Sequence, residues 1–205
     1  MDKELRTQRT YNNIAQRWAR EHNTKEYWRE EFEVFSRLVP HGRILDVGCG
    51  SGRDYQLFQE KGYGYTGVDF SQGLLNTARS RFPAVQCVEG NMYSLPFSEH
   101  KFDGFWAAAS LLHIPKQNIP VTLQDIKRVI RENGAGAIML KRGEGEKIVI
   151  DDSHTGDEND GRFFAYWQKD EFTDVLRNAG FTVADFLEKP VSERTIWLSF
   201  FVRIT

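Results

Sequence analysis

The sequence predicts an α/β fold, doubly wound, in which helices cover both faces of a mostly parallel β-sheet. Short apolar runs alternate along the chain with segments whose apolar residues recur every three or four positions. A glycine-rich turn, ILDVGCGSGRD at residues 44–54, joins the first apolar run to the helical pattern after it. The chain has 205 residues, which fits a single domain with its own hydrophobic core.

The first elements follow from these patterns. Residues 24–39 predict an amphipathic helix, because apolar side chains recur on one face: Trp28, Phe32, Phe35 and Val39. Residues 43–48, RILDVG, form a short apolar run ending in glycine, which is typical of a buried strand. A helix is expected over residues 51–61, ended by Gly62, since glycine readily takes the left-handed conformation at a helix end.

The same alternation continues through the middle of the chain. Residues 63–70, YGYTGVDF, predict a second strand, and residues 71–82 predict a helix with Ser71 as its N-cap. Residues 84–91, AVQCVEGN, and residues 102–109, FDGFWAAA, predict a third and a fourth strand.

The last third of the chain predicts two helices and three strands. Apolar positions mark one helix, expected to end at Gly134, and another that ends before Gly180; these positions are Leu123, Ile126, Val129 and Ile130, then Phe172, Val175, Leu176 and Ala179. Residues 136–141 predict a fifth strand. Residues 181–189 and 195–204 predict a hairpin with an antiparallel strand on or near one sheet edge. The acidic stretch 143–161 is expected to be irregular.

Composition narrows the class of protein. The net charge of −2 provides no basic field for a phosphate backbone, so nucleic acid is not an expected partner. The two cysteines, Cys49 and Cys87, have no C-x-x-C spacing, which argues against a zinc knot or a disulfide framework, and no metal site is expected. No apolar run approaches the roughly 18 residues of a membrane span, and a cytoplasmic location is predicted.

The glycine-rich turn indicates a ligand site. It lies at the carboxyl edge of the predicted sheet, where doubly wound folds bind ligands. Its spacing is G-x-G-x-G rather than the dinucleotide G-x-G-x-x-G, since Arg53 takes the sixth position from Gly48. Asp69, at the end of the second strand, stands where an acid can bind ribose hydroxyls. These features predict that the site binds a nucleoside with a non-phosphate arm. One alternative is a tight turn that binds no ligand. A nicotinamide-dependent enzyme is a more remote alternative, because the glycine spacing argues against it.

Four motifs in a fixed order resemble one family. ILDVGCGSGRD, GVDFS, EGNMYSLPF and FDGFWAAASLLHI are similar to the motifs of class I S-adenosylmethionine-dependent methyltransferases. The resemblance implies a Rossmann-like sheet of seven strands in the order 3-2-1-4-5-7-6, with strand 7 antiparallel. It implies one domain over residues 1–205, with residues 1–40 as a helical lid and residues 41–205 as a cofactor-binding core. Residues 141–168 would form an acceptor-side loop.

The resemblance also implies how S-adenosylmethionine, and its product S-adenosylhomocysteine, would be held at the first two strands. Asp46 and the turn of Gly48, Cys49 and Gly50 would hold the methionine part. Asp69 would bind the ribose hydroxyls.

Three further residues are implied around the adenine. Phe70 would pack on the ring, and Asn91 with the amide of Met92 would reach its edge. The family usually carries Asp at the position of Asn91, but an amide oxygen can still accept a hydrogen bond from the adenine amino group.

The remaining implied contacts come from the fourth strand and the N-terminal segment. Ala107 would offer its carbonyl to the ammonium group of the cofactor. The segment YNNIAQRW resembles the part of the family that closes over the cofactor, so Tyr11 and Trp18 are predicted contacts.

His113 is the candidate catalytic residue. It follows the fourth strand at the edge of the crevice, and an unperturbed histidine titrates near neutral pH. A base is needed only when the acceptor must lose a proton, because positioning alone accelerates an in-line displacement. The alternative is that His113 packs against the segment that follows it.

The acceptor side is less specific. Charged residues at the end of the fifth strand either orient a polar acceptor or form an ordinary solvated surface: Lys141, Arg142, Glu144 and Glu146. The residues after the acidic stretch either line an acceptor pocket or cover the edge of the sheet: Arg162, Phe163, Phe164, Tyr166 and Trp167. The acidic residues would repel a polyanion: Asp151, Asp152, Asp157, Glu158 and Asp160. A small-molecule acceptor is therefore predicted; the alternatives are a macromolecular acceptor and a binding protein without catalysis.

Overall fold

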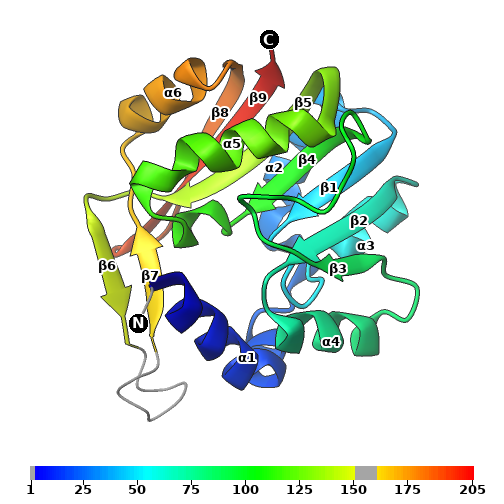
Figure 1. Cartoon of the computed structure of the whole chain (residues 1–205), viewed down its shortest axis with the longest axis vertical. Helices are drawn as coiled ribbons and strands as arrows, with labels where there is room; N and C mark the ends of the chain where they lie inside the picture. Colours follow the sequence, from blue (N-terminus) through cyan, green and yellow to red (C-terminus); the bar gives the residue numbers. More distant parts are fainter. Residues whose placement is uncertain (1–2, 151–160) are drawn as a thin grey trace.

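The computed structural model describes residues 3–150 and 161–205, and a seven-stranded sheet lies at its centre (Figure 1). The α-helices are α1 (Lys3–Glu21), α2 (Arg29–Leu38), α3 (Tyr55–Glu60), α4 (Gln72–Arg81), α5 (Ile119–Val129) and α6 (Lys169–Asn178), with short 3₁₀ helices η1 (Lys25–Trp28), η2 (Leu111–His113) and η3 (Lys116–Asn118). The strands are β1 (Arg43–Val47), β2 (Gly64–Asp69), β3 (Cys87–Glu89), β4 (Phe102–Ala108), β5 (Ile130–Lys141), β6 (Glu146–Val149), β7 (Arg162–Ala165), β8 (Phe181–Ser192) and β9 (Thr195–Ile204).

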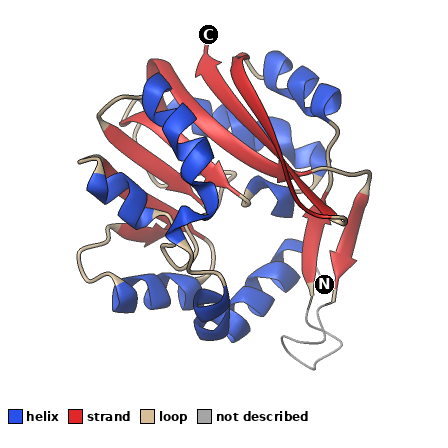
Figure 2. Ribbon diagram, turned by 180° about the vertical axis from the view of Figure 1, so that it is seen from behind, coloured by secondary structure: helices blue, strands red, loops and turns tan. Residues whose placement is uncertain are grey.

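The strand order confirms the predicted fold. The central sheet runs β3-β2-β1-β4-β5-β9-β8, in which β9 is antiparallel to both of its neighbours and the other pairs are parallel. The strands β9 and β8 take the places of the expected strands 7 and 6, because β6 and β7 form a separate two-stranded hairpin. Helices cover both faces of the sheet, with α5 in front of it in Figure 1 and α2 on the far side (Figures 1 and 2).

Aromatic side chains form the core between α2, α3 and the sheet. Phe32, Phe35, Phe58 and Trp106 are fully buried, and their rings meet edge to face. The Phe32 and Phe58 centroids are 5.1 Å apart, and those of Phe35 and Trp106 are 5.5 Å apart. Burying each such side chain contributes about 1.5–3 kcal/mol, which explains why the predicted apolar face of α2 packs on the sheet.

Two sequence predictions were wrong at element boundaries. The helix expected to reach Gly134 ends at Val129, and Ile130 already pairs with Phe102 at the start of β5. Asn133 has φ 59°, so the chain bends within β5 before Ala135 enters the regular ladder with Gly104. The stretch expected to be irregular contains the strand β6, while the acidic residues of 151–160 lie outside the described residues.

Helix α1 lies across the carboxyl edge of the sheet, between α4 and the β6–β7 hairpin (Figure 1). On one side, Asn12 Oδ1 accepts hydrogen bonds from the Gly73 amide (2.9 Å) and the Ser71 hydroxyl (2.8 Å). On the other side, Thr7 Oγ1 accepts a hydrogen bond from the Phe163 amide (2.9 Å). The N-terminal helix therefore bridges two parts of the chain that are far apart in the sequence. Within the described parts, none of the helices has the length and apolar character to span a bilayer.

A substitution in β5 tests the packing of the sheet. Gly136 pairs with Phe105, and a Cβ atom at Gly136 would lie 2.1 Å from the Phe105 ring. We expect Gly136→Ala to lower the free energy of unfolding by about 1–3 kcal/mol, measured by urea denaturation, because this core position has no room for a methyl group. As the control, Gly62→Asn should change stability little, since Gly62 has φ 75° and nothing within 4 Å of its Cβ position. Equal stability of the two variants would contradict this account of the core.

Candidate functional site

The glycine-rich turn begins where β1 ends. Gly48 and Gly50 have φ of 77° and 54°, a left-handed conformation that favours glycine. A Cβ atom at Gly48 would also lie 2.3 Å from the Cβ atom of Ser110. The amides of Gly48 and Cys49 both donate hydrogen bonds to the Val68 carbonyl, at 2.7 and 3.0 Å. The turn therefore passes close to β2 and the end of β4 and leaves its other side without side chains.

Asp69 connects this turn to α4. Its carboxylate accepts hydrogen bonds from the Gly50 amide (2.9 Å) and the Ser71 amide (2.8 Å). Burial raises the pKa of Asp69 to about 6, and the hydrogen bonds from backbone amides oppose this rise. Ser71 then caps α4 by accepting a hydrogen bond from Leu74, as predicted. The acid expected to face a ribose thus stands at the turn, with both of its oxygens directed by backbone groups.

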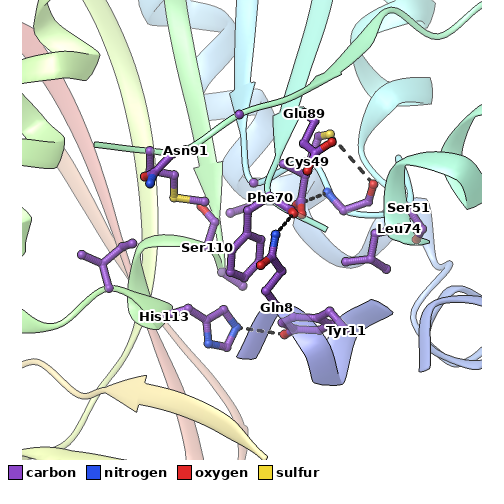
Figure 3. Close-up of a pocket in the computed structure, with 18 of the residues that line it drawn as sticks. Gln8, Tyr11, Cys49, Ser51, Phe70, Leu74, Glu89, Asn91, Ser110 and His113 are labelled. Carbon is purple, nitrogen blue, oxygen red and sulfur yellow. Dashed lines mark hydrogen bonds between the residues drawn. The ribbon is translucent and has the colours of Figure 1, made fainter. Parts of the chain in front are cut away.

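The first cavity lies beside the turn and has a volume of about 510 Å³, which is within the usual range for a small-molecule site (Figure 3). Nine of the predicted cofactor contacts line it: Tyr11, Trp18, Gly48, Cys49, Gly50, Asp69, Phe70, Asn91 and Met92. The structure thus brings together residues from α1, the turn, β2 and the segment after β3.

Two predicted contacts do not line this cavity. Ala107 is fully buried inside β4, and the cavity wall begins one residue later, at Ala108. Ala109, the next residue of the wall, has an unusual φ of 58°. Asp46 lies behind the turn, where its carboxylate accepts a hydrogen bond from the Tyr65 hydroxyl (2.7 Å). Burial and the nearby Asp54 carboxylate raise the pKa of Asp46.

Sequence reasoning missed several residues of the first cavity. Glu4 and Gln8 lie on α1 on the same face as Tyr11, at helical spacing, and this spacing is the signal that could have revealed them. Gln8 Nε2 donates a hydrogen bond to the Phe70 carbonyl (2.5 Å), which holds α1 over β2 (Figure 3). Ser110 also lines the cavity, and its buried hydroxyl oxygen has no hydrogen-bond partner among the described residues.

An ion pair between Arg53 and Asp54 connects the glycine-rich turn to β4. Arg53 donates two hydrogen bonds to the Asp54 carboxylate, at 2.7 and 2.9 Å, in the bidentate geometry that makes such pairs strong. The indole N–H of Trp106 donates a third hydrogen bond to Asp54 (3.0 Å). The charge of Arg53 is therefore balanced inside the protein.

A second cavity of about 490 Å³ adjoins the first. The two cavities share the side chains of six residues: Tyr11, Trp18, His22, Arg53, Ala109 and His113. The rest of the second cavity comes from η1, β5, β7 and the tip of the β8–β9 hairpin, where Val191, Ser192 and Thr195 line it.

The structure divides the residues predicted for the acceptor side. Lys141, Arg162 and Phe164 line the second cavity, whereas Phe163 and Trp167 belong to the hydrophobic core. Two of the charged residues form ion pairs away from the cavity, Arg142 with Glu188 (2.6 Å) and Glu146 with Lys3 (3.3 Å). Glu144 lines neither cavity.

His113 lies in the wall shared by the two cavities, and both of its ring nitrogens have partners. Nδ1 is 2.6 Å from the Phe163 carbonyl, which can only accept, so Nδ1 carries the proton. Nε2 lies 2.9 Å from the Tyr11 hydroxyl and accepts its hydrogen bond (Figure 3). Burial lowers the pKa of His113 to about 3, with the charges of Arg162 and Lys141 adding to the effect. His113 is therefore neutral, and it lines both cavities together with Tyr11.

A family model described as a methyltransferase domain matches residues 44–134 of the chain. The 2-phytyl-1,4-naphtoquinone methyltransferase of Trichormus variabilis is 31% identical over 153 residues, which cover 70% of this chain and 60% of that protein. The O-methyltransferase resE of Aspergillus sclerotiorum is 30% identical over 171 residues, which cover 76% of this chain and 61% of that protein. The chain thus spans about 60% of the length of these relatives.

A solved structure matches nearly the whole chain. The 1,6-didemethyltoxoflavin-N1-methyltransferase of Burkholderia thailandensis, with 1,6-didemethyltoxoflavin and S-adenosylhomocysteine bound, has a TM-score of 0.76 at 22% identity. The match covers 98% of this chain and 88% of that one. At this identity the likeness concerns the fold, and it includes the β6–β7 region because almost every residue is covered.

The low pKa of His113 predicts how stability depends on pH. An unfolded chain binds a proton at histidine below about pH 6.5, whereas folded His113 stays neutral down to about pH 3. Because the unfolded state binds more protons in this window, the free energy of unfolding falls as the pH is lowered. His113→Asn removes this component, so the stability difference between wild type and variant should change by about 2 kcal/mol between pH 6.5 and 5. Urea denaturation at each pH measures it, and parallel profiles would contradict the buried neutral state.

Proposed function

The chain belongs to the class I S-adenosylmethionine-dependent methyltransferase family, and we propose that it transfers a methyl group from S-adenosylmethionine to a small organic acceptor. One observation carries the proposal: two cavities, each large enough for a small molecule, meet at a shared wall. One cavity is lined by Gly48, Gly50 and Asp69, and the other is lined by none of these residues. A donor and an acceptor bound in adjoining cavities can be held in reacting geometry, which lowers the barrier of a displacement.

The residues of the first cavity fit S-adenosylmethionine, which when bound supplies an electrophilic methyl group. The turn of Gly48 to Gly50 leaves room for a ligand close to the backbone. The buried hydroxyl of Ser110, without a partner among the described residues, is available to the ligand beside this turn. Asp69 would take the ribose hydroxyls, and Phe70 with Asn91 would contact the adenine. We propose that α1 acts as the lid, because it crosses this edge of the sheet.

The names of similar proteins support a small acceptor. They include 2-phytyl-1,4-naphtoquinone and 1,6-didemethyltoxoflavin, and both are small molecules. The two buried cysteines, Cys49 and Cys87, are free thiols, which agrees with the proposed cytoplasmic location.

His113 is proposed to act through Tyr11 rather than directly on the acceptor. Tyr11 lines both cavities, and its hydroxyl donates a hydrogen bond to His113 Nε2. An acceptor N–H or O–H can therefore donate a hydrogen bond to the Tyr11 oxygen while His113 stays neutral. The Phe163 carbonyl fixes the ring by its hydrogen bond from Nδ1, which keeps Nε2 directed at Tyr11. In this arrangement Tyr11 would contact the acceptor, and His113 would orient the Tyr11 hydroxyl.

Isothermal titration calorimetry tests the cofactor site. S-adenosylmethionine and S-adenosylhomocysteine should bind, and NAD should not. Asp69→Ala should weaken the binding of S-adenosylhomocysteine at least about tenfold, because each hydrogen bond to this carboxylate contributes roughly 1.5–3 kcal/mol. Asp174→Ala, which removes an exposed acid of α6, is the matched control and should bind like the wild type. Binding of NAD alone would sink the cofactor proposal.

Release of S-adenosylhomocysteine in the presence of an acceptor library tests the reaction itself. With an acceptor found, Tyr11→Phe and His113→Asn should each lower turnover by roughly 10²-fold, because the hydrogen bond that positions the acceptor is lost. The double variant should be little slower than either single variant, because the two residues act as a unit. Binding of S-adenosylhomocysteine to His113→Asn should remain as in the wild type. Full turnover by His113→Asn would remove it from the mechanism, and binding without turnover for any acceptor would favour a non-catalytic protein.

A further inference from the structure

The wall of the second cavity carries two cations that both lie close to one aromatic ring, that of Phe164. Lys141 Nζ lies 4.8 Å from the centroid of the Phe164 ring, and Arg162 Cζ lies 5.5 Å from it. Lys141 is also 5.5 Å from the Trp197 ring, and Arg162 is 4.6 Å from the Trp18 ring. Cations and rings therefore alternate along the wall from α1 to β9.

One of these cations, Lys141, has no carboxylate partner in the described part of the chain. Lys141 lines the cavity and forms no ion pair or hydrogen bond with any of the described residues. Arg53 lines it too, but Asp54 neutralises that charge. Among the described lining residues, Glu21 is the only carboxylate, and it is exposed at the end of α1. Burial and the charge of Arg162 lower the pKa of Lys141, so its charged form lacks compensation in the free protein. A negative charge in the cavity would supply it.

The other polar groups of the second cavity include donors. The buried indole N–H of Trp28 has no hydrogen-bond partner among the described residues. Tyr27 accepts a hydrogen bond from Trp197 Nε1 (2.8 Å), which leaves the Tyr27 proton free to be donated. Donors next to cations favour a ligand with several acceptor oxygens or nitrogens, and the aromatic rings favour a flat one.

We propose that the second cavity selects a planar aromatic acceptor that carries a negative charge, with Lys141 and Arg162 binding the charge and the rings of Trp18, Phe164 and Trp197 enclosing the plane. This inference rests on the proposed function, since it names the class of acceptor. An acidic heterocycle, a phenolate or an aromatic carboxylate has this chemistry. Lys141 is then a specificity-determining residue, because it contributes charge that no described carboxylate balances.

Three probes test the proposal on protein saturated with S-adenosylhomocysteine. The probes are 2-naphthoate, 2-naphthamide, which has the same shape without the charge, and adamantane-1-carboxylate, which has the charge without the plane. Titration calorimetry should show 2-naphthoate binding at least about tenfold more tightly than either of the others. Lys141→Met should abolish the preference for 2-naphthoate over 2-naphthamide, and Lys141→Arg should retain it. Lys101→Met is the matched control, because Lys101 also lies over aromatic rings but lines neither cavity.

The outcomes separate this inference from the proposed function. If S-adenosylhomocysteine does not bind, the proposed function fails before any probe is added. If it binds, equal affinity for 2-naphthoate and 2-naphthamide, including no detectable binding of either, overturns the anionic acceptor. A preference that survives in Lys141→Met, or that Lys101→Met abolishes equally, overturns the role of Lys141.

Discussion

The arrangement of the site depends on the hydrogen bonds of the Asp69 carboxylate. Asp69 is the last residue of β2, and its carboxylate accepts hydrogen bonds from the amides of Gly50 and Ser71. These bonds join the turn after β1 to the start of α4. Asn12 on α1 is bonded to the same helix start, through Ser71 and Gly73. A single buried acid thus links the turn, the strand and, through α4, the helix that walls both cavities. Burial raises the pKa of this acid to about 6, and the backbone amides that hold it compensate only in part.

Like charges lie close together beside each cavity. Behind the first cavity, burial and the Asp54 carboxylate raise the pKa of Asp46, and in the second cavity burial and the charge of Arg162 lower the pKa of Lys141. These like charges repel each other in the free protein. Ligands of the opposite sign relieve this cost and therefore stabilise the folded state when they bind. The free protein accordingly gives up some stability for a site that is arranged before its ligands arrive.

The strand order was expected from the resemblance of four motifs to one family, and the structure confirms it. The places of the glycine-rich turn and of Asp69 in the fold could be predicted from local patterns. The glycines at 48 and 50 and the acid at Asp69 have fixed places relative to strand ends, and the fold places strand ends together. Ala107, predicted to contact the cofactor, does not line the first cavity, whereas Ala108 and Ala109 do, since strand ends cannot be located to a single position from apolar runs. Gly134 was taken for a helix stop, although pairing with β4 draws the chain into a strand from Ile130. The charge environment of Lys141 depends on contacts among β5, β7 and β9, which no local pattern contains.

The tip of the β8–β9 hairpin contributes to the second cavity and not to the first. This tip, closed by a turn at residues 193–194, contributes Val191, Ser192 and Thr195 to the second cavity and nothing described to the first. The tip can therefore be exchanged as a unit, for example by grafting, to reshape the second cavity without replacing any described residue of the first.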